Sequence, residues 1–193
     1  MRNEVTDLLD ELDRKQLLDL ARRALEARVR RGQPPQVDCT GTLALRRGAF
    51  VSIHHRGDLR GCLGRLTLET PLGLTIVHLA GVVADSDPRF AAVLPHELPD
   101  LLIEISVLTP AREIASVDEI EVGRHGLIIE DGTSRGLLLP QVASEQRWTS
   151  GTFVEHTCIK AGLPRDAWKK GARIFVFEAQ VFGEDQSDGT TAI

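Results

Sequence analysis

The chain has 193 residues, and 42% of them are hydrophobic, which is enough to bury the core of one domain or of two small subdomains. The formal net charge is −5, aromatic residues make up only 4%, and tyrosine is absent. A chain with no global positive field and few rings for stacking is poorly suited to DNA or RNA, so the composition argues against nucleic-acid binding.

The first predicted element is a helix over residues 14–31. Asp13 and Gln16 have the spacing of a capping box, and apolar residues then recur at helical intervals. Gly32 and the prolines that follow it end this pattern. The sequence therefore predicts one long amphipathic helix near the N-terminus.

A β-hairpin is predicted after this helix. The β-like run 49–53 and the stretch 59–66 lie on either side of residues 56–58, whose Arg-Gly-Asp sequence favours a turn. A second helix is then predicted to begin at Thr70, as its N-cap, and Pro71, as its first helical residue.

The second helix is predicted to end near residues 85–88, because the residue before a proline is pushed away from helical geometry. Apolar and polar residues alternate over 102–108, which predicts a strand with one wet face. Residues 127–130 and 136–139 are predicted to form a second hairpin with a five-residue connection.

A capping box that begins at Thr152 predicts a helix through Ala161, and one last strand is predicted near residues 174–182. Strands and helices interleave irregularly, and several strands join through short hairpins. This order predicts an α+β fold with a mixed or antiparallel sheet against which the helices pack. We expect the folded domain to cover 13–183 and the polar C-terminal tail, 184–193, to be flexible.

The segment 59–64, Leu-Arg-Gly-Cys-Leu-Gly, is the most informative for chemistry. On a regular strand Arg60 and Cys62 share one face, and a guanidinium beside a thiol favours the reactive thiolate. Gly61 and Gly64 weaken a strand, which suggests the close approach of a ligand or of another backbone. The alternative is that Cys62 is a small buried hydrophobe and that the glycines mark a bulge.

Two further places offer polar side chains. Asp87 and Arg89 flank a proline and could grip a polar ligand from one exposed turn. Alternatively, Asp87 caps that turn and Arg89 forms a salt bridge between parts of the fold. His125 could act as a general base or a ligand, although a single histidine beside a strand is more often a structural group.

Cysteine and histidine spacing bears on location and cofactors. Three cysteines stand at irregular intervals, the charged N-terminus carries no secretory signal, and no apolar run is long enough to cross a bilayer. These features predict a cytoplasmic protein without a membrane segment. The sequence has neither the spacing of a metal motif nor a glycine-rich phosphate loop, so no metal and no other cofactor is expected.

Five segments, taken in order, resemble the signature segments of the AMMECR domain family. They are Leu59-Arg60-Gly61-Cys62-Leu63-Gly64, Asp87-Pro88-Arg89-Phe90, His125-Gly126-Leu127, Leu138-Leu139-Pro140-Gln141-Val142-Ala143 and Cys158-Ile159-Lys160-Ala161-Gly162-Leu163-Pro164. The resemblance extends from the helix near Asp13 to the strand near Phe182. Within the family, the chain looks most similar to bacterial and archaeal members called AmmeMemoRadiSam system protein A.

The resemblance implies two interlocked α+β subdomains, with the Arg-Gly-Cys segment close to a cleft between them. It also implies that the protein belongs to a three-protein set. The expected partners are a radical S-adenosylmethionine (SAM) enzyme and a Memo-like protein related to ring-cleaving dioxygenases.

Three classes of function remain open at this point. The first is an enzyme or accessory component that captures a small ligand in the cleft. Cys62 would be the nucleophile or thiolate contact, Arg60 its activator, and Asp87, Arg89 and His125 would orient the ligand beside Gly61 and Gly64. The second is a noncatalytic adaptor whose motif residues form an interface and a core. The third is a regulator that binds nucleic acid, against which charge and composition argue.

Overall fold

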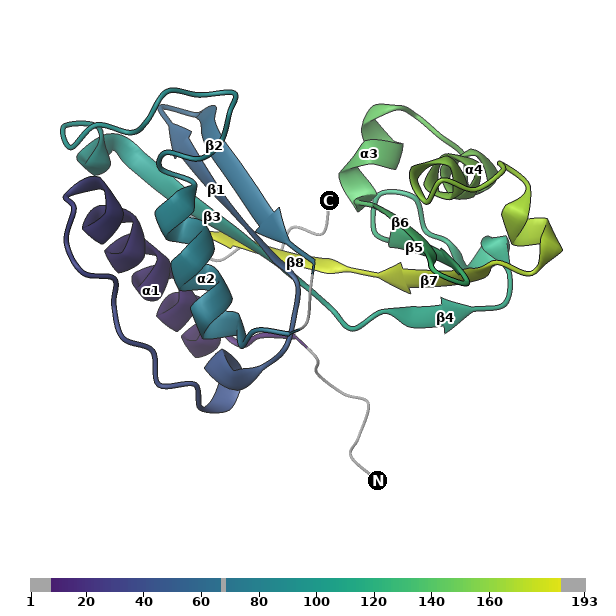
Figure 1. Ribbon diagram of the computed structural model, residues 1–193, viewed down its shortest axis with the longest axis horizontal. Helices are drawn as coiled ribbons and strands as arrows, with labels where there is room; N and C mark the ends of the chain where they lie inside the picture. Colours follow the sequence, from purple (N-terminus) through teal and green to yellow (C-terminus); the bar gives the residue numbers. More distant parts are fainter. Residues whose placement is uncertain (1–7, 67–68, 185–193) are drawn as a thin grey trace. The chain divides into compact units, whose positions relative to one another are not determined.

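A computed structural model describes residues 8–66 and 69–184 (Figure 1). The chain forms two compact units, each with its own four-stranded sheet and hydrophobic core. The first unit contains the chain up to Leu108 and resumes at Gln180, while the second extends from Thr109 to Ala179. The fold is α+β with antiparallel strand pairs, as the sequence predicts.

The first unit has a sheet with the strand order β2-β1-β3-β8. Helices α1 and α2 lie side by side over one face of it (Figure 1), and their apolar residues join the inward-facing residues of β1 and β3 in one core. Its elements are α1 (Glu11–Val29), η1 (Gly41–Ala44), β1 (Ala49–His55), β2 (Asp58–Arg65), α2 (Leu72–Val82), η2 (Leu98–Asp100), β3 (Leu101–Leu108) and β8 (Ala179–Gly183).

The second unit has a sheet with the strand order β4-β7-β5-β6. Helix α4 packs on β5 and β6, and the fully buried ring of Phe153 lies in this core. The elements of this unit are β4 (Arg112–Ile114), η3 (Val117–Glu119), β5 (Gly126–Asp131), β6 (Ser134–Leu138), α3 (Pro140–Glu145), α4 (Ser150–Lys160), η4 (Ala167–Lys170) and β7 (Arg173–Phe177).

Helix starts differ from the predicted ones in a regular way. The N-cap of α1 is Asp10, which accepts a hydrogen bond at 2.8 Å from the backbone N–H of Asp13. The N-cap of α4 is Thr149, which accepts a hydrogen bond at 3.3 Å from the N–H of Thr152. The predicted caps Asp13 and Thr152 are therefore third helical residues. In α2, Pro71 itself is the N-cap.

The hairpins are confirmed, with different turn lengths. β1 and β2 are joined by Arg56 and Gly57, whose φ angles of 53° and 90° suit a tight two-residue turn. β5 and β6 are joined by two residues and not by five. The single strand predicted near 174–182 is wrong, because the chain breaks at Glu178 into β7 and β8, which belong to different sheets.

The end of the described chain is anchored at Glu184. Its carboxylate forms an ion pair with Arg22 and accepts a hydrogen bond at 2.8 Å from the backbone N–H of Ile103. The rest of the tail, 185–193, lies outside the described residues. Within the described ranges, no helix is both long and apolar enough to span a bilayer.

Candidate functional site

The candidate site is built on β2, which is an edge strand of the first sheet. Pairing with β1 matches Ile53 to Gly61 and His54 to Leu59, so Arg60 is an extra residue in a β-bulge. The bulge interrupts the strict alternation on which the expected Arg60–Cys62 pairing depended. Cys62 itself stands opposite Ser52 and is half-buried.

The backbone of Cys62 is held from the open side of the sheet by the turn that follows α2. Its N–H donates a hydrogen bond at 2.9 Å to Oδ2 of Asp87, and its carbonyl oxygen accepts one at 3.4 Å from Nη2 of Arg89. An edge strand leaves such groups without a neighbouring strand. Asp87 and Arg89 supply the missing partners and fix the position of the Cys62 main chain.

Asp87 and Arg89 also bind each other. Nε and Nη2 of Arg89 donate to the two carboxylate oxygens of Asp87 at 3.0 and 2.7 Å, and the backbone N–H of Arg89 donates to Oδ1 at 3.1 Å. The Asp87 side chain is only 3% exposed. The Arg89 guanidinium, aided by the N–H groups of Cys62 and Arg89, holds the pKa of Asp87 far below its usual range, although burial opposes the shift. Asp87 is therefore a carboxylate at neutral pH.

Arg89 keeps an open side toward solvent. Its side chain is 55% exposed, and no described residue accepts a hydrogen bond from Nη1. The hydrogen bonds to Asp87 raise the pKa of Arg89, and the charge of a Cys62 thiolate adds in the same direction. The thiol and the guanidinium are thus within electrostatic reach, an arrangement that can bind a small anion or an anionic electrophile.

Arg60 has a different task from the expected one. Its guanidinium binds Glu97, with Nε to Oε1 at 2.9 Å and Nη2 to Oε2 at 3.2 Å, and donates to the carbonyl oxygens of Ala91 and Ala92. The hydrogen bond from Arg60 lowers the pKa of Glu97. Arg60 therefore anchors the loop between α2 and η2 and is not the cation presented to Cys62.

Gly61 and Gly64 serve packing in the first unit. A methyl group at Gly61 would lie 3.1 Å from both the carbonyl oxygen and a methyl of Val83. At Gly64 it would overlap the ring of Phe50, with Cγ at 2.6 Å. The close approaches that the sequence suggested are thus made by the end of α2 and by an aromatic ring.

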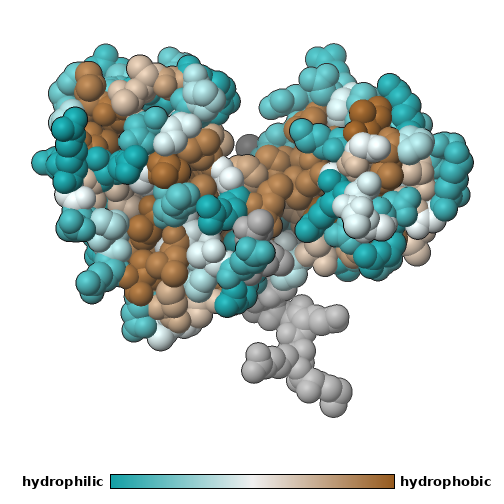
Figure 2. Space-filling model, viewed as in Figure 1, coloured by the Kyte–Doolittle hydropathy of each residue, from teal (hydrophilic) through white to brown (hydrophobic). Residues whose placement is uncertain are grey.

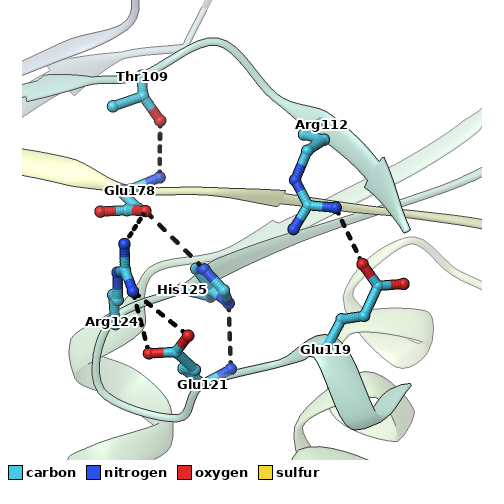
Figure 3. A network of polar contacts seen from close by, with 7 residues as sticks. All are labelled: Thr109, Arg112, Glu119, Glu121, Arg124, His125 and Glu178. Carbon is cyan, nitrogen blue, oxygen red and sulfur yellow. Dashed lines mark hydrogen bonds and ion pairs between the residues drawn. The ribbon is translucent and has the colours of Figure 1, made fainter. Parts of the chain in front are cut away.

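His125 belongs to the second unit and is buried there. Its Nδ1 accepts a hydrogen bond at 3.1 Å from the backbone N–H of Glu121, and its Nε2 lies 3.9 Å from Oε1 of Glu178 (Figure 3). Arg124 binds the carboxylates of both Glu121 and Glu178. This network fixes the ring between two neighbours, whereas Cys62, Asp87 and Arg89 come together in the first unit.

The cysteines and a possible metal site are the remaining candidates from the sequence. The three cysteines are free thiols, and burial raises the pKa of Cys158. In the described part of the chain, no group of three or more His, Cys, Asp or Glu side chains is placed to hold a metal ion. Sequence reasoning missed Glu97, and the only signal for it was that a half-buried guanidinium on β2 requires an acidic partner.

The comparisons with known proteins cover nearly the whole chain. Residues 18–182 match the AMMECR1 family. A protein of Methanosarcina mazei is 38% identical in an alignment of length 192 that covers 94% of this chain and 96% of that protein. A protein of Methanothermobacter thermautotrophicus is 42% identical in an alignment of length 178 that covers 88% of this chain and 93% of that protein. The crystal structure of an uncharacterized protein, PH0010, from Pyrococcus horikoshii superimposes with a TM-score of 0.74 at 37% identity, over 93% of this chain and 95% of that one.

Proposed function

Since the chain belongs to the AMMECR1 family, we propose that it is an accessory, substrate-handling component that acts with a radical SAM enzyme and a Memo-like protein. Its task is to bind a small anionic ligand or intermediate at Cys62. The choice of partners rests on the resemblance of the signature segments. The choice of site rests on the geometry of β2 and the turn after α2.

One observation carries the proposal of a ligand site: a clamped, half-exposed cysteine lies beside a guanidinium that still has donors to offer. Nη1 of Arg89 binds the anionic group of the ligand, while the Cys62 thiol contacts its reactive or apolar part. Asp87 positions both residues, since it holds the Cys62 backbone and two nitrogens of Arg89. The proposal gives Arg60 the role of a positioning residue for the loop and assigns no step to His125.

The test uses two alkylating reagents that differ in charge. Iodoacetate is an anion and iodoacetamide is neutral, and both convert an accessible thiolate to a thioether with loss of iodide. We expect Cys62 to react faster relative to Cys39 with iodoacetate than with iodoacetamide, because the Arg89 guanidinium attracts the anion. In Arg89→Gln this preference should fall several-fold. In Arg165→Gln, an exposed arginine of the second unit, it should not change.

Two results would contradict the ligand site. The first is a Cys62 thiol that reacts with neither reagent in the folded protein while the half-buried Cys39 reacts with both. The second is a charge preference at Cys62 that survives the loss of Arg89. Either result would leave Cys62 as a packing residue of the edge strand.

One observation also favours the adaptor alternative. The hydrogen bonds of Asp87 and Arg89 to the Cys62 backbone cover an open sheet edge, and a noncatalytic protein needs this as well. The two functions separate in Cys62→Ser. Ligand handling predicts loss of the pathway's product in cells, with unchanged co-purification of the radical SAM enzyme and the Memo-like protein. A pathway that runs normally with Cys62→Ser favours the adaptor and contradicts capture by the thiol.

A further inference from the structure

The C-terminal end of α1 borders a hollow of about 760 Å³ that is unrelated to the Cys62 thiol. One wall is formed by residues 28–32 of α1 and the turn after it, and the other by residues 92–95 of the loop before η2. Figure 2 shows apolar and hydrophilic surface intermingled on the face that carries α1 and α2. The hollow is mixed in the same way, because arginines face it from one wall and Val93, Leu94 and Pro95 from the other.

A second hollow, of about 320 Å³, lies between α1 and α2. It is lined mainly by apolar residues of α2, among them Leu74 and Val77, and it shares Arg28 and Gly32 with the first hollow. Arg28 and Gly32 thus border both hollows. Each hollow alone has the size of a small-molecule pocket, and an extended chain that crosses these two residues would reach both.

The wall of the first hollow that contains residues 92–95 is held in place by hydrogen bonds within the unit. Arg60 binds the carbonyl oxygens of Ala91 and Ala92, and the N–H of Val93 donates at 2.7 Å to the carbonyl oxygen of Ala84. The N–H of Leu94 donates at 2.7 Å to Glu97. A groove whose backbone is fixed in advance loses little entropy when it binds a partner.

Charge identifies the kind of partner. Arg28 pairs with Asp85 at 2.7 Å, but Arg30 and Arg31 are exposed and their guanidiniums have no acceptor within the described residues. Among the described residues that line this hollow, Asp85 is the one acid beside three arginines, so this lining is positive in a chain whose net charge is −5. Two uncommitted guanidiniums beside an apolar wall complement a segment that carries both carboxylates and apolar side chains.

The backbone at Arg31 adds an independent observation. Arg31 has a φ of 56°, in the left-handed region, at the position after a helix where glycine is favoured. Gly32 follows directly, and its N–H donates at 2.7 Å to the carbonyl oxygen of Ala27. An arginine thus stands where the turn would be less strained with glycine, and it is one of the residues that line the hollow.

We propose that the two hollows, which we call the α1–α2 groove, together bind an acidic linear segment of a partner protein. Apolar side chains of the segment lie in the hollow lined by Leu74 and Val77, and its carboxylates bind Arg30 and Arg31. The proposal does not depend on Cys62, and it stands if that thiol proves inert. Where the proposed function also holds, the groove is a means by which the protein is held to its partner.

The test measures binding of fluorescein-labelled synthetic peptides by fluorescence polarisation. The peptides place two leucines at increasing distances before three glutamates, and a control series has serines for the leucines. We expect at least one spacing to bind in a salt-dependent way, and the serine series to bind less tightly. In Arg30→Glu/Arg31→Glu the dissociation constant should rise about tenfold or more, while Leu74→Ser should weaken only the peptides that carry leucine.

Arg147 provides a matched control, because it is also exposed, also has no acceptor within the described residues, and follows α3 with a φ of 53°. Arg31→Gly and Arg147→Gly should both raise the midpoint of thermal unfolding, since glycine relieves a left-handed residue. Only Arg31→Gly should weaken peptide binding.

Three outcomes would overturn the proposal. No peptide of the series binds even at low salt, or binding is the same in Arg30→Glu/Arg31→Glu as in the unaltered protein. Alternatively, the serine series binds as tightly as the leucine series and inorganic pyrophosphate displaces both, which would make the hollow a pocket for a small anion.

Discussion

Oδ2 of Asp87 accepts a hydrogen bond at 2.9 Å from the backbone N–H of Cys62, 25 positions earlier in the chain. This bond attaches the turn after α2 to an edge strand. The carboxylate accepts the hydrogen bond that a neighbouring strand would otherwise accept. Because the same carboxylate binds Arg89, the position of the thiol, the position of the guanidinium and the stability of the sheet edge depend on one side chain.

Asp87→Ala should destabilise the first unit by about 2–4 kcal/mol, because it leaves the N–H of Cys62 without an acceptor and Arg89 without its partner. Urea unfolding followed by circular dichroism measures the change. As a control, Asp166→Ala removes the carboxylate of an exposed ion pair with Lys170 and should lower the stability far less. Equal effects of the two substitutions would contradict the importance of the Asp87 clamp.

The contribution of the Asp87 charge should depend on pH in a defined direction. Its pKa in the folded protein is held below the ordinary value of about 3.9, chiefly by Arg89, so the unfolded chain takes up a proton first. Stability from this charge is therefore present above the ordinary pKa and is lost as the pH falls toward the depressed one. Asp87→Asn keeps an acceptor oxygen and removes the charge. The difference in unfolding free energy between wild type and this variant should be constant near neutral pH and shrink below about pH 4. A difference that grew on acidification would reverse the sign and contradict the assignment.

Arg60→Ala should loosen the loop before η2 and not the Cys62 backbone alone. The substitution removes the partner of a carboxylate that is 14% exposed and the donor to two carbonyl oxygens, at a cost of about 2–3 kcal/mol. Amide hydrogen exchange should accelerate most at Leu94, whose N–H donates to Glu97. A double-mutant cycle with Glu97→Gln should show strong coupling. The exposed pair Arg23–Asp19 should show almost none, and similar couplings in the two pairs would contradict the anchoring role of Arg60.

Local patterns in the sequence identified most of the fold. The apolar period of α1 and the turn residues between β1 and β2 depend on near neighbours, and both elements were predicted correctly. Errors occurred where two local patterns compete. In α1 and α4 the third helical residue is itself a good cap, so the predicted start lies three residues late. The break at Glu178 has no local marker, because β7 and β8 are both apolar and only their sheets differ.

In the candidate site, too, local relationships are predictable from the sequence and long-range partners are not. The sequence places Asp87 and Arg89 on one turn, but it predicted neither their ion pair with each other nor their hydrogen bonds to the backbone of Cys62. The sequence predicts that Arg60 lies beside Cys62, because regular alternation places them on one face. In the structure a one-residue bulge interrupts this alternation, and Arg60 pairs with Glu97, 37 positions away. Partners so distant in the chain are chosen by the tertiary fold, and no spacing within β2 encodes them.

Gly136 lies on β6, where α4 ends against the strand. A methyl group there would overlap the backbone of Ala161, with its Cα at 2.7 Å, whereas at Gly64 the three nearest atoms would all belong to the ring of Phe50. A ring can turn aside but a packed helix end cannot, so Gly136→Ala should cost about 3 kcal/mol, more than Gly64→Ala. Urea unfolding followed by circular dichroism compares the two variants, and tryptophan fluorescence reports on the second unit, which contains Trp148.

Gly151 offers the matched control within the same unit. It lies in α4 and a methyl group there would meet nothing within 4 Å, so Gly151→Ala should leave stability unchanged or raise it by up to about 1 kcal/mol through helix propensity. If Gly136→Ala proved as harmless as Gly151→Ala, α4 would have to shift along β6 at little cost. The close contact between this helix and the strand would then not be what orders the second core.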